Sequence, residues 1–596
     1  MRARKLTEMA YKQMIRTAKG LEAASVWITG GTILDVYTKS WRQADIVLSG
    51  ERIAYVGEKA PFVNQDTICI NAKDKYIVPG YIEPHAHPFQ WYNPFTLADY
   101  ALQTGTTTMV SDSLFLFQLL PYDKLSSLLD EINKHPVKQF FWARLDSQTL
   151  PDPEGVFQRE RIKELLAHPL VIQAGELTDW RGILDEREEL LEGMHYALDL
   201  GKRIEGHHPG ASYQTLALAA AHGVGACHES MTADELLHRL QVGMYATLRH
   251  SSIRPDLPKL IKEWKQLGLP WSPRMMLTSD GATAPMLRNG VMDYTIRVAI
   301  EAGMPMEEAY VMATLNPATY YQMDTEIGGI APGRVADILL LTERSNPTPE
   351  TVIANGLLIA DEGQAKAKIP KRQLSEFISI GSTMEETVSD HWFQFPEQEQ
   401  EQEQEQAQAQ ALHLDSLPVI CMMNSVISKL DTTTVIHNWE ELVQIPDAML
   451  AVLIDPKTKQ LTKAILRGFA VELEALATTF HASTEFLVLG RNPQAMKAAL
   501  QEIVASKGGV AIIEKEEVLF HMPLPIGGKM TDEPMEIVME KSELFTTLMR
   551  ERGYRFDDPI YSLLFFTATH LPFVRFTKAG IYEVKTGTMI YPASPI

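Results

Sequence analysis

The sequence predicts an α/β protein in which a (β/α)8 barrel of the TIM type is inserted in a small β-sandwich domain and followed by a C-terminal mixed α/β domain. Three observations lead to this prediction. Short apolar runs alternate with segments of helical periodicity, a glycine-punctuated strand pattern occurs on both sides of them, and a low-complexity tract precedes the last third of the chain. Alternating strands and helices are typical of a parallel sheet, and eight such units in about 250 residues have the size of a barrel.

The chain opens with a basic, helix-compatible stretch that lacks the apolar core of a secretion signal, so we expect a helical extension over 1–24. An organelle transit helix is the alternative, but Glu8 and Glu22 disfavour it. Residues 25–76 and 325–370 carry β-branched runs broken by glycine, which indicate strands joined by tight turns. We expect these two segments to form one small β-domain.

The barrel is predicted over 77–324, with each strand followed by a helical segment. The eight predicted strands are Ile77–Ile82, Thr106–Val110, Gln139–Ala143, Leu170–Ala174, Arg203–Glu205, Gly223–Cys227, Gly243–Leu248 and Met275–Leu277.

A Glu-Gln and Ala-Gln tract (Pro396–Leu412) cannot supply a packed core, so we predict a linker over 390–415, with a solvated helix as the alternative. Residues 416–596 then form the C-terminal domain, with strands near Ala451–Leu453, Phe486–Leu489 and Val510–Ile513. Two roles stay open for this domain: it either covers the site as a lid or serves assembly.

Composition excludes several classes of function. The 596 residues contain 55 Lys+Arg and 76 Asp+Glu, a net charge of −21, so the chain lacks the basic footprint of a nucleic-acid binder. No run approaches the roughly 18–20 apolar residues that span a bilayer, so we expect no membrane protein. The three cysteines are widely spaced, which argues against a disulfide framework or a thiolate zinc site. We therefore expect a cytoplasmic protein.

The strongest local motif is PGYIEPHAH, in which His85 and His87 are alternate residues of a predicted strand. Alternate residues point to the same face, so the two imidazoles are placed to bind one metal ion, and Zn, Fe, Mn and Ni all suit imidazole. Further polar residues stand where later predicted strands end. They are Glu176, His207, His228 and Asp280.

Strand ends of a barrel converge on one mouth, where active sites are built. We therefore predict one or two divalent ions bound by His85, His87, Glu176, His207 and His228. A carboxylate can bridge two ions, and a metal-bound water near neutral pH becomes a nucleophile. Asp280 would accept the proton of this water and return it to a leaving group. Each residue alone could instead be a structural hydrogen-bonding group, but six at strand ends favour function.

Two further charged residues have open roles. Arg249, at the end of the seventh strand, either contacts substrate or neutralises carboxylates, and Glu229 either contacts a polar substrate edge or is a surface charge of a loop. Other candidates receive no catalytic role. His208 faces away from His207, and Cys227 is expected to be a small buried packing residue rather than a nucleophile. His222, His238 and His250 are expected on helices or surface loops.

These motifs resemble the amidohydrolase superfamily and, within it, the prokaryotic adenine deaminases. PGYIEPHAH is similar to the family's first-strand metal motif, GHHPG to its G-H-A-P-G, CHES to its D-H-E and LTSDG to its T-D-D. The segments MATLNPA, IAPGRVADILLL, MPLPIGGKM and DDPIYSLLFF extend the resemblance to nearly the whole chain, apart from the N-terminal helix and the Gln-rich tract.

The resemblance implies the hydrolysis of adenine to hypoxanthine and ammonia with two divalent metals, often manganese or iron; zinc is also possible. It places His85, His87, Glu176, His207 and His228 at ligand or site positions and Asp280 at the catalytic aspartate, with His228 polarising or orienting. A purine base is then the partner, and a homodimer is common for such barrels.

Three motifs depart from the family pattern. The family's H-I-E-S-S is His87-Pro88-Phe89-Gln90 here, its D-P-H-E is Asp112-Ser113-Leu114-Phe115, and its H-D-S-H-N is His481-Ala482-Ser483-Thr484-Glu485. Each lost group could bind a metal or hold the purine edge, and polar groups of this kind decide specificity. Two alternatives to adenine deamination therefore stay open. One is hydrolysis of another purine, amide or cyclic amide, and the other is a catalytically degenerate paralogue that binds without turnover.

Overall fold

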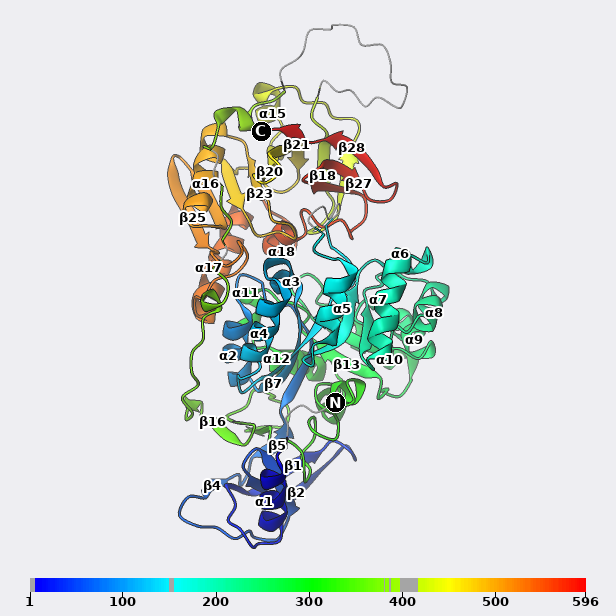
Figure 1. Cartoon of the computed structure of the whole chain (residues 1–596), viewed down its shortest axis with the longest axis vertical. Coiled ribbons are helices and arrows are strands. Elements are labelled where there is room, and N and C mark those ends of the chain that lie inside the picture. Colours follow the sequence, from blue (N-terminus) through cyan, green and yellow to red (C-terminus); the bar gives the residue numbers. More distant parts are fainter. Residues whose placement is uncertain (1–5, 150–154, 380, 385–386, 397–415) are drawn as a thin grey trace.

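The computed structural model describes residues 6–149, 155–379, 381–384, 387–396 and 416–596. Three parts follow one another along the long axis of the molecule: a small β-domain at one end, a barrel in the middle and a C-terminal domain at the other end (Figure 1). The predicted N-terminal extension contains helix α1 (Glu8–Ala18), which is capped by the Thr7 hydroxyl and packs on strands β2 (Ser40–Ser49) and β3 (Arg52–Gly57).

Within the described residues, the small domain is one sheet of nine strands drawn from both sides of the barrel. Its central contact is the antiparallel pairing of β5 with β14, in which Ile77 lies opposite Leu340. Strands from both sides of the barrel therefore lie in one sheet. Besides β2 and β3, its strands are β1 (Val26–Asp35), β4 (Ile68–Asn71), β5 (Tyr76–Pro79), β14 (Ile338–Leu341), β15 (Thr351–Ala354), β16 (Leu357–Asp361) and β17 (Gln364–Ala365).

The barrel is a parallel sheet of eight strands in sequence order, β6 to β13, counted over the described residues. Its two outer strands meet where Thr278 Oγ1 donates to Glu83 Oε1 (2.5 Å) and to the backbone oxygen of His85 (3.1 Å). The predicted barrel is therefore confirmed. Its strands are β6 (Tyr81–Ala86), β7 (Thr106–Asp112), β8 (Lys138–Ala143), β9 (Val171–Leu177), β10 (Arg203–Gly206), β11 (Ala226–Cys227), β12 (Tyr245–Arg249) and β13 (Met275–Thr278).

Helices follow the strands and cover the barrel's outer surface (Figure 1). They are α2 (Pro94–Gln103), α3 (Leu114–Leu119), α4 (Tyr122–Ile132), α5 (Arg159–Ala167), α6 (Trp180–Leu184), α7 (Glu188–Asp199), α8 (Tyr213–Ala221), α9 (Ala233–Gln241), α10 (Leu257–Leu267), α11 (Ala284–Leu287), α12 (Met292–Glu301), α13 (Met306–Met312) and α14 (Leu315–Tyr320).

The first predicted strand, Ile77–Ile82, is wrong as a single element. It is divided at Gly80 into β5, which belongs to the small sheet, and β6, which begins the barrel at Tyr81. Gly80 permits a close approach, because a Cβ there would lie 2.2 Å from Thr107 Oγ1. The apolar run continues through this junction without a polar break, so the pattern alone could not locate it.

The C-terminal domain contains, among its described residues, a nine-stranded sheet and a three-stranded sheet. The strands expected near residues 451, 486 and 510 are present as β20, β23 and β24. The first sheet comprises β18 (Val419–Met422), β19 (Ser428–Asp431), β20 (Ala448–Asp455), β21 (Gln460–Arg467), β22 (Ala475–Thr478), β23 (Phe486–Gly490), β24 (Gly509–Glu514), β25 (Glu517–Pro523) and β29 (Ser594–Pro595). The second comprises β26 (Val574–Thr577), β27 (Gly580–Glu583) and β28 (Thr588–Pro592), and the helices are α15 (Trp439–Gln444), α16 (Pro493–Ala505), α17 (Met535–Glu551) and α18 (Pro559–Leu564).

The predicted linker overlaps a packed segment at its start. The 3-10 helix η1 (Leu374–Glu376) precedes the predicted linker. A second one, η2 (Asp390–Phe393), forms its first residues, and Trp392 and Phe393 of η2 are buried in the core of the C-terminal domain. The range 397–415, which holds most of the Gln-rich tract, lies outside the described residues.

The C-terminal domain covers the mouth of the barrel. The Tyr561 hydroxyl donates to the backbone oxygen of Gly281, directly after Asp280, and Thr283 Oγ1 donates to Asp558 Oδ2 (2.7 Å). A site at the strand ends is therefore enclosed between two domains. None of the helices in the described part of the chain combines the length and the apolar character that a membrane crossing needs.

Candidate active site

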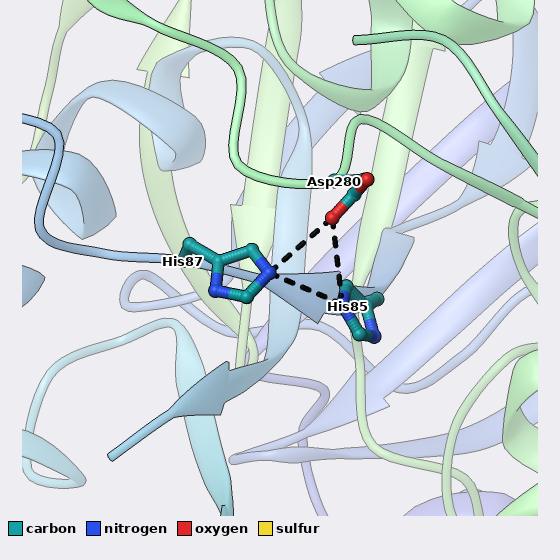
Figure 2. Close-up of side chains that lie close together, drawn as sticks. All are labelled: His85, His87 and Asp280. Atoms are coloured by element: carbon teal, nitrogen blue, oxygen red, sulfur yellow. Dashed lines mark hydrogen bonds and ion pairs between the residues drawn. The ribbon is translucent and has the colours of Figure 1, made fainter. Parts of the chain in front are cut away.

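The six predicted strand-end residues lie together at the barrel mouth. His85 and His87 come from the end of β6, and Asp280 follows β13 on the other side of the closure (Figure 2). The two Nε2 atoms are 3.2 Å apart, and Asp280 Oδ1 lies 3.4 Å from the first and 3.3 Å from the second. These three side chains thus surround one point, although Asp280 is 195 positions from His85 in the sequence.

The surroundings of these imidazoles determine which nitrogen is free. His85 Nδ1 lies 2.9 Å from Glu205 Oε2, and His87 Nδ1 lies 3.1 Å from Asp112 Oδ2. When each Nδ1–H donates to its carboxylate, both Nε2 atoms keep a lone pair that faces the other and the Asp280 oxygen. Three converging acceptors repel one another unless a proton or a metal ion lies between them. This donor set therefore fits a metal ion, with the carboxylates orienting its imidazole ligands.

A second group of possible ligands adjoins the first. Glu176 Oε1 lies 2.6 Å from His207 Nδ1 and 3.3 Å from His228 Nε2, while its Oε2 lies 3.8 Å from His87 Nε2 and 4.0 Å from His85 Nε2. One carboxylate oxygen thus faces each pair of histidines. This arrangement matches a carboxylate that can bridge two ions.

Three buried residues that support these groups were not predicted as site residues. Glu205 binds His85 as above and His228 Nδ1 through Oε1 (3.2 Å), so one carboxylate orients an imidazole of each pair. Arg144 Nη2 lies 2.8 Å from Glu176 Oε2 and also binds Asp112. Asp112 ends β7 and Arg144 directly follows β8, so the strand-end signal would have found both. Glu205 is two positions before His207, on the same face of its strand.

Carboxylates outnumber guanidinium groups in the site. Burial disfavours ionisation of Asp112, but Arg144 and His87 outweigh it and hold its pKa below the ordinary value. Burial also opposes ionisation of Glu205, yet His85 and His228 lower its pKa to about 2. Within the described residues, four carboxylates pair with the guanidinium groups of Arg144, Arg249 and Arg254, namely those of Asp112, Glu176, Glu229 and Asp280, whereas Glu205 faces His85 and His228. The surplus of anionic groups suits a divalent cation.

Asp280 has an unusual backbone conformation. Its φ is +43°, in the left-handed region that non-glycine residues rarely adopt, and its N–H donates to Thr278 Oγ1 (3.0 Å). Such conformations cluster at functional sites, where surrounding structure maintains them. Oδ1 faces His85 and His87, while Oδ2 lies 2.6 Å from Arg249 Nη1.

The structure shows the contacts of the two charged residues with open roles. Arg249 pairs with both Glu229 and Asp280, so it neutralises carboxylates, and it also lines the cavity. Glu229 is 1% exposed and accepts a second bond from Arg254 (2.8 Å). The surface-charge interpretation of Glu229 is therefore wrong, because two arginines hold it inside the site.

Several residues expected to have no catalytic role lie as follows. Cys227 and His208 are fully buried, and His222 is a half-buried residue directly after α8. His250, expected on a helix or surface loop, is buried directly after β12, where its ring contacts that of Tyr294 (centroids 5.6 Å apart). His481 is buried in the C-terminal domain, where Nε2 binds the backbone oxygen of Glu485 (2.9 Å).

A cavity of about 500 Å³ lies between the metal-ligand cluster and the C-terminal domain. Its walls combine aromatic rings with a few charged groups, as small-molecule sites usually do. Tyr561 and Phe565 contribute parallel rings whose centroids are 5.5 Å apart, and these residues are more than 280 positions from the barrel's last strand end in sequence, so no local pattern could have indicated them. The main aromatic and charged lining residues are Phe89, Phe115, Tyr561, Phe565, His87, Glu176, His207, Arg249 and Asp280.

Comparison with known proteins agrees with this architecture. Residues 76–359 match the amidohydrolase family, and residues 426–588 match the adenine deaminase C-terminal domain. Two relatives carry the name "Putative adenine deaminase": one from Halalkalibacterium halodurans is 37% identical over 590 residues, covering 98% of each chain, and YerA from Bacillus subtilis is 35% identical over 564 residues, covering 94% of each. An adenine deaminase from Moorella thermoacetica is 25% identical and covers 97% of each chain. The chain therefore belongs to the adenine deaminase family of the amidohydrolase superfamily.

Proposed function

We propose that this protein is an adenine deaminase, which converts adenine and water to hypoxanthine and ammonia in purine metabolism. The observation that carries the proposal is the cluster of imidazole nitrogens and carboxylate oxygens that converge on one point at the wall of an aromatic cavity. Membership of the family and the names of its relatives support adenine as the substrate.

The residues proposed to hold one or two divalent ions are His85, His87, Glu176, His207 and His228. Manganese or iron is favoured and zinc is possible, since imidazole and carboxylate suit all three. When bound, such ions lower the pKa of a coordinated water and so make a nucleophile available at neutral pH.

The proton is handled by Asp280 in this proposal. Its Oδ1 faces the histidine pair, so it can accept a proton from the attacking water and deliver it to the departing ammonia. Arg249 binds the other oxygen of Asp280 and fixes its direction. His228 orients or polarises the reacting group, and Glu205 in turn holds the ring of His228.

Ammonia release from adenine tests the proposal. The purified chain is reconstituted separately with Mn(II), Fe(II) and Zn(II), and Asp280→Asn is measured beside it. We expect metal-dependent ammonia release that falls by at least about 100-fold in Asp280→Asn, because general acid–base catalysis contributes about 10²–10⁴. Metal should still bind in this variant, because asparagine keeps a side-chain oxygen and the five proposed ligands are unchanged. Asp361→Asn on β16, in the small sheet, serves as the matched control.

The other outcomes have definite meanings. No turnover of adenine with metal bound would refute adenine as the substrate and favour another purine, an amide or a cyclic amide. No metal binding and no turnover would favour a degenerate paralogue that only binds a ligand. Near-full activity of Asp280→Asn would refute the proton transfer assigned to it.

We also propose a cytoplasmic location and a homodimer. The three cysteines are free, which agrees with a reducing compartment. Closed dimers are the commonest assemblies of soluble enzymes, and size-exclusion chromatography with light scattering would test this one.

A further inference from the structure

A buried amide lies without a fixed partner in the wall of the active-site cavity. Gln90 follows the metal-site histidine His87 by three residues, lines the cavity and is only 2% exposed. Its Oε1 is inaccessible to solvent and accepts no hydrogen bond from any described residue. Such an atom is uncommon, because a buried polar group without a partner costs free energy. The amide therefore keeps hydrogen-bonding capacity that a ligand in the cavity can use.

The backbone around Gln90 is held firmly on its C-terminal side. The backbone oxygen of Trp91 accepts a hydrogen bond from Thr531 N (2.9 Å). The Trp91 ring packs against Phe480, Phe520 and Phe545 of the C-terminal domain. Tyr92 Oη donates to the backbone oxygen of Ala282 (2.7 Å), two residues after Asp280.

Asn93 completes this anchorage. Its Nδ2 donates to the backbone oxygen of Thr531 (2.8 Å), and its Oδ1 caps α2. The segment is thus fixed to the barrel, the Asp280 loop and the C-terminal domain together. A group carried by so rigid a segment binds a ligand with little loss of conformational entropy.

Aromatic rings beside Gln90 can hold a flat ligand. Phe89 and Phe115 meet edge to face with centroids 4.7 Å apart, and Tyr561 and Phe565 line the cavity from the C-terminal domain. A heterocycle that packs on rings leaves its in-plane nitrogen atoms to be paired at the edge. A primary amide suits this task because it donates and accepts side by side, and a 180° turn of the amide exchanges the two ends.

We propose that Gln90 is a specificity-determining residue that binds the purine edge remote from C6 with its side-chain amide. This inference rests on the proposed deaminase function. On that edge N3 and N9–H lie side by side, in both adenine and hypoxanthine, and they match the donor and acceptor of the amide. The reacting carbon C6 then faces the opposite side, toward the histidines and Asp280.

Three variants test this inference. Gln90→Met keeps the length of the side chain and removes the amide, while Gln90→Glu keeps the shape and an acceptor but loses the donor. Gln139→Met is the matched control, because Gln139 is a buried glutamine of β8 that does not line the cavity and donates to the Pro94 oxygen (3.5 Å). Kinetics with adenine and direct calorimetric binding of hypoxanthine are measured for each, with metal content and melting temperature.

We expect Gln90→Met to raise KM for adenine and Kd for hypoxanthine about tenfold, the effect of losing a good amide–base pairing. The change in kcat should be smaller than threefold, and Gln139→Met should change neither constant. With 3-deazaadenine, which lacks N3, the wild type should bind more weakly than with adenine, whereas Gln90→Met should bind both bases equally.

Unchanged KM and Kd in Gln90→Met, within about twofold, would overturn the inference while the deaminase function stands. If the wild type does not turn over adenine, the proposed function fails, and hypoxanthine binding then decides: weaker binding by Gln90→Met supports the role of the amide, and no binding by the wild type overturns it. If Gln90→Met does not fold, Gln90→Glu gives the decision, with about tenfold weaker hypoxanthine binding expected and an unchanged Kd refuting the inference.

Discussion

Replacement of Glu205 by glutamine should impair metal binding although Glu205 is not itself a predicted ligand. The carboxylate receives bonds from His85 Nδ1 (2.9 Å), His228 Nδ1 (3.2 Å) and Gln173 Nε2 (2.9 Å), and it is 2% exposed. In Glu205→Gln one oxygen and one NH2 group face these three donors. At least one imidazole must then move its proton to Nε2, the nitrogen that faces the other ligands.

The size of the effect follows from the bonds lost. A hydrogen bond to a charged group contributes about 1.5–3 kcal/mol, and loss of the groups that orient metal ligands typically costs about 10–100-fold in affinity. We expect a 10–100-fold weaker affinity of the Mn(II)-loaded protein for metal, read as metal retained during dialysis against chelators of graded strength.

The control is Glu326→Gln. It removes a half-buried carboxylate that pairs with Arg52 (2.7 Å) outside the cavity. It should retain metal like the wild type. Metal retention by Glu205→Gln within twofold of the wild type would refute the argument that this carboxylate sets the tautomers of both histidines.

Three further predictions concern stability. Burial raises the pKa of Asp146 to about 6, so the stability that its protonated carboxyl gives is fully present below the ordinary pKa near 3.8 and is lost as the pH rises through 6. Asp146→Asn should therefore be more stable than the wild type by about 1–3 kcal/mol at pH 8 and should lose this advantage toward pH 4. Urea unfolding at both pH values measures the difference in stability, and a difference that does not narrow at pH 4 would contradict the prediction. Lys138→Met leaves Asp337 without its buried partner (2.8 Å) and should cost about 3–5 kcal/mol, with equal unfolding midpoints as the opposing result. Tyr561→Phe leaves the Gly281 oxygen without its donor and should cost about 1–3 kcal/mol and lower kcat, while unchanged stability and kcat would show that this contact does not hold the Asp280 loop.

Much of the fold could be predicted because local periodicity records which residues are buried. Seven of the eight predicted barrel strands correspond to the observed strands β7 to β13, and the strands of both flanking segments join in one sheet through β5 and β14. The boundary at Gly80 was missed because both strands that meet there are apolar, and the change of sheet depends on a close approach to Thr107 that periodicity does not record.

The candidate site was predictable to the extent that its residues stand at strand ends. The same signal extends to Asp112 and Arg144, whereas Glu205 lies within its strand and is distinguished only by its spacing from His207. Tyr561 and Phe565 belong to a separate domain, so their place in the cavity wall depends on how that domain packs.

The sequence alone determined the order of strands and helices, the alternation that puts His85 and His87 on one face, and the polar residues that end the strands, since each of these depends on neighbours a few positions away. Only the tertiary structure decided that Glu205 orients two histidines, that Arg249 and Arg254 bury Glu229, and that the C-terminal domain closes the cavity beside Gln90. These contacts join residues far apart in the chain, and they exist only because the barrel closes and a second domain packs over its mouth.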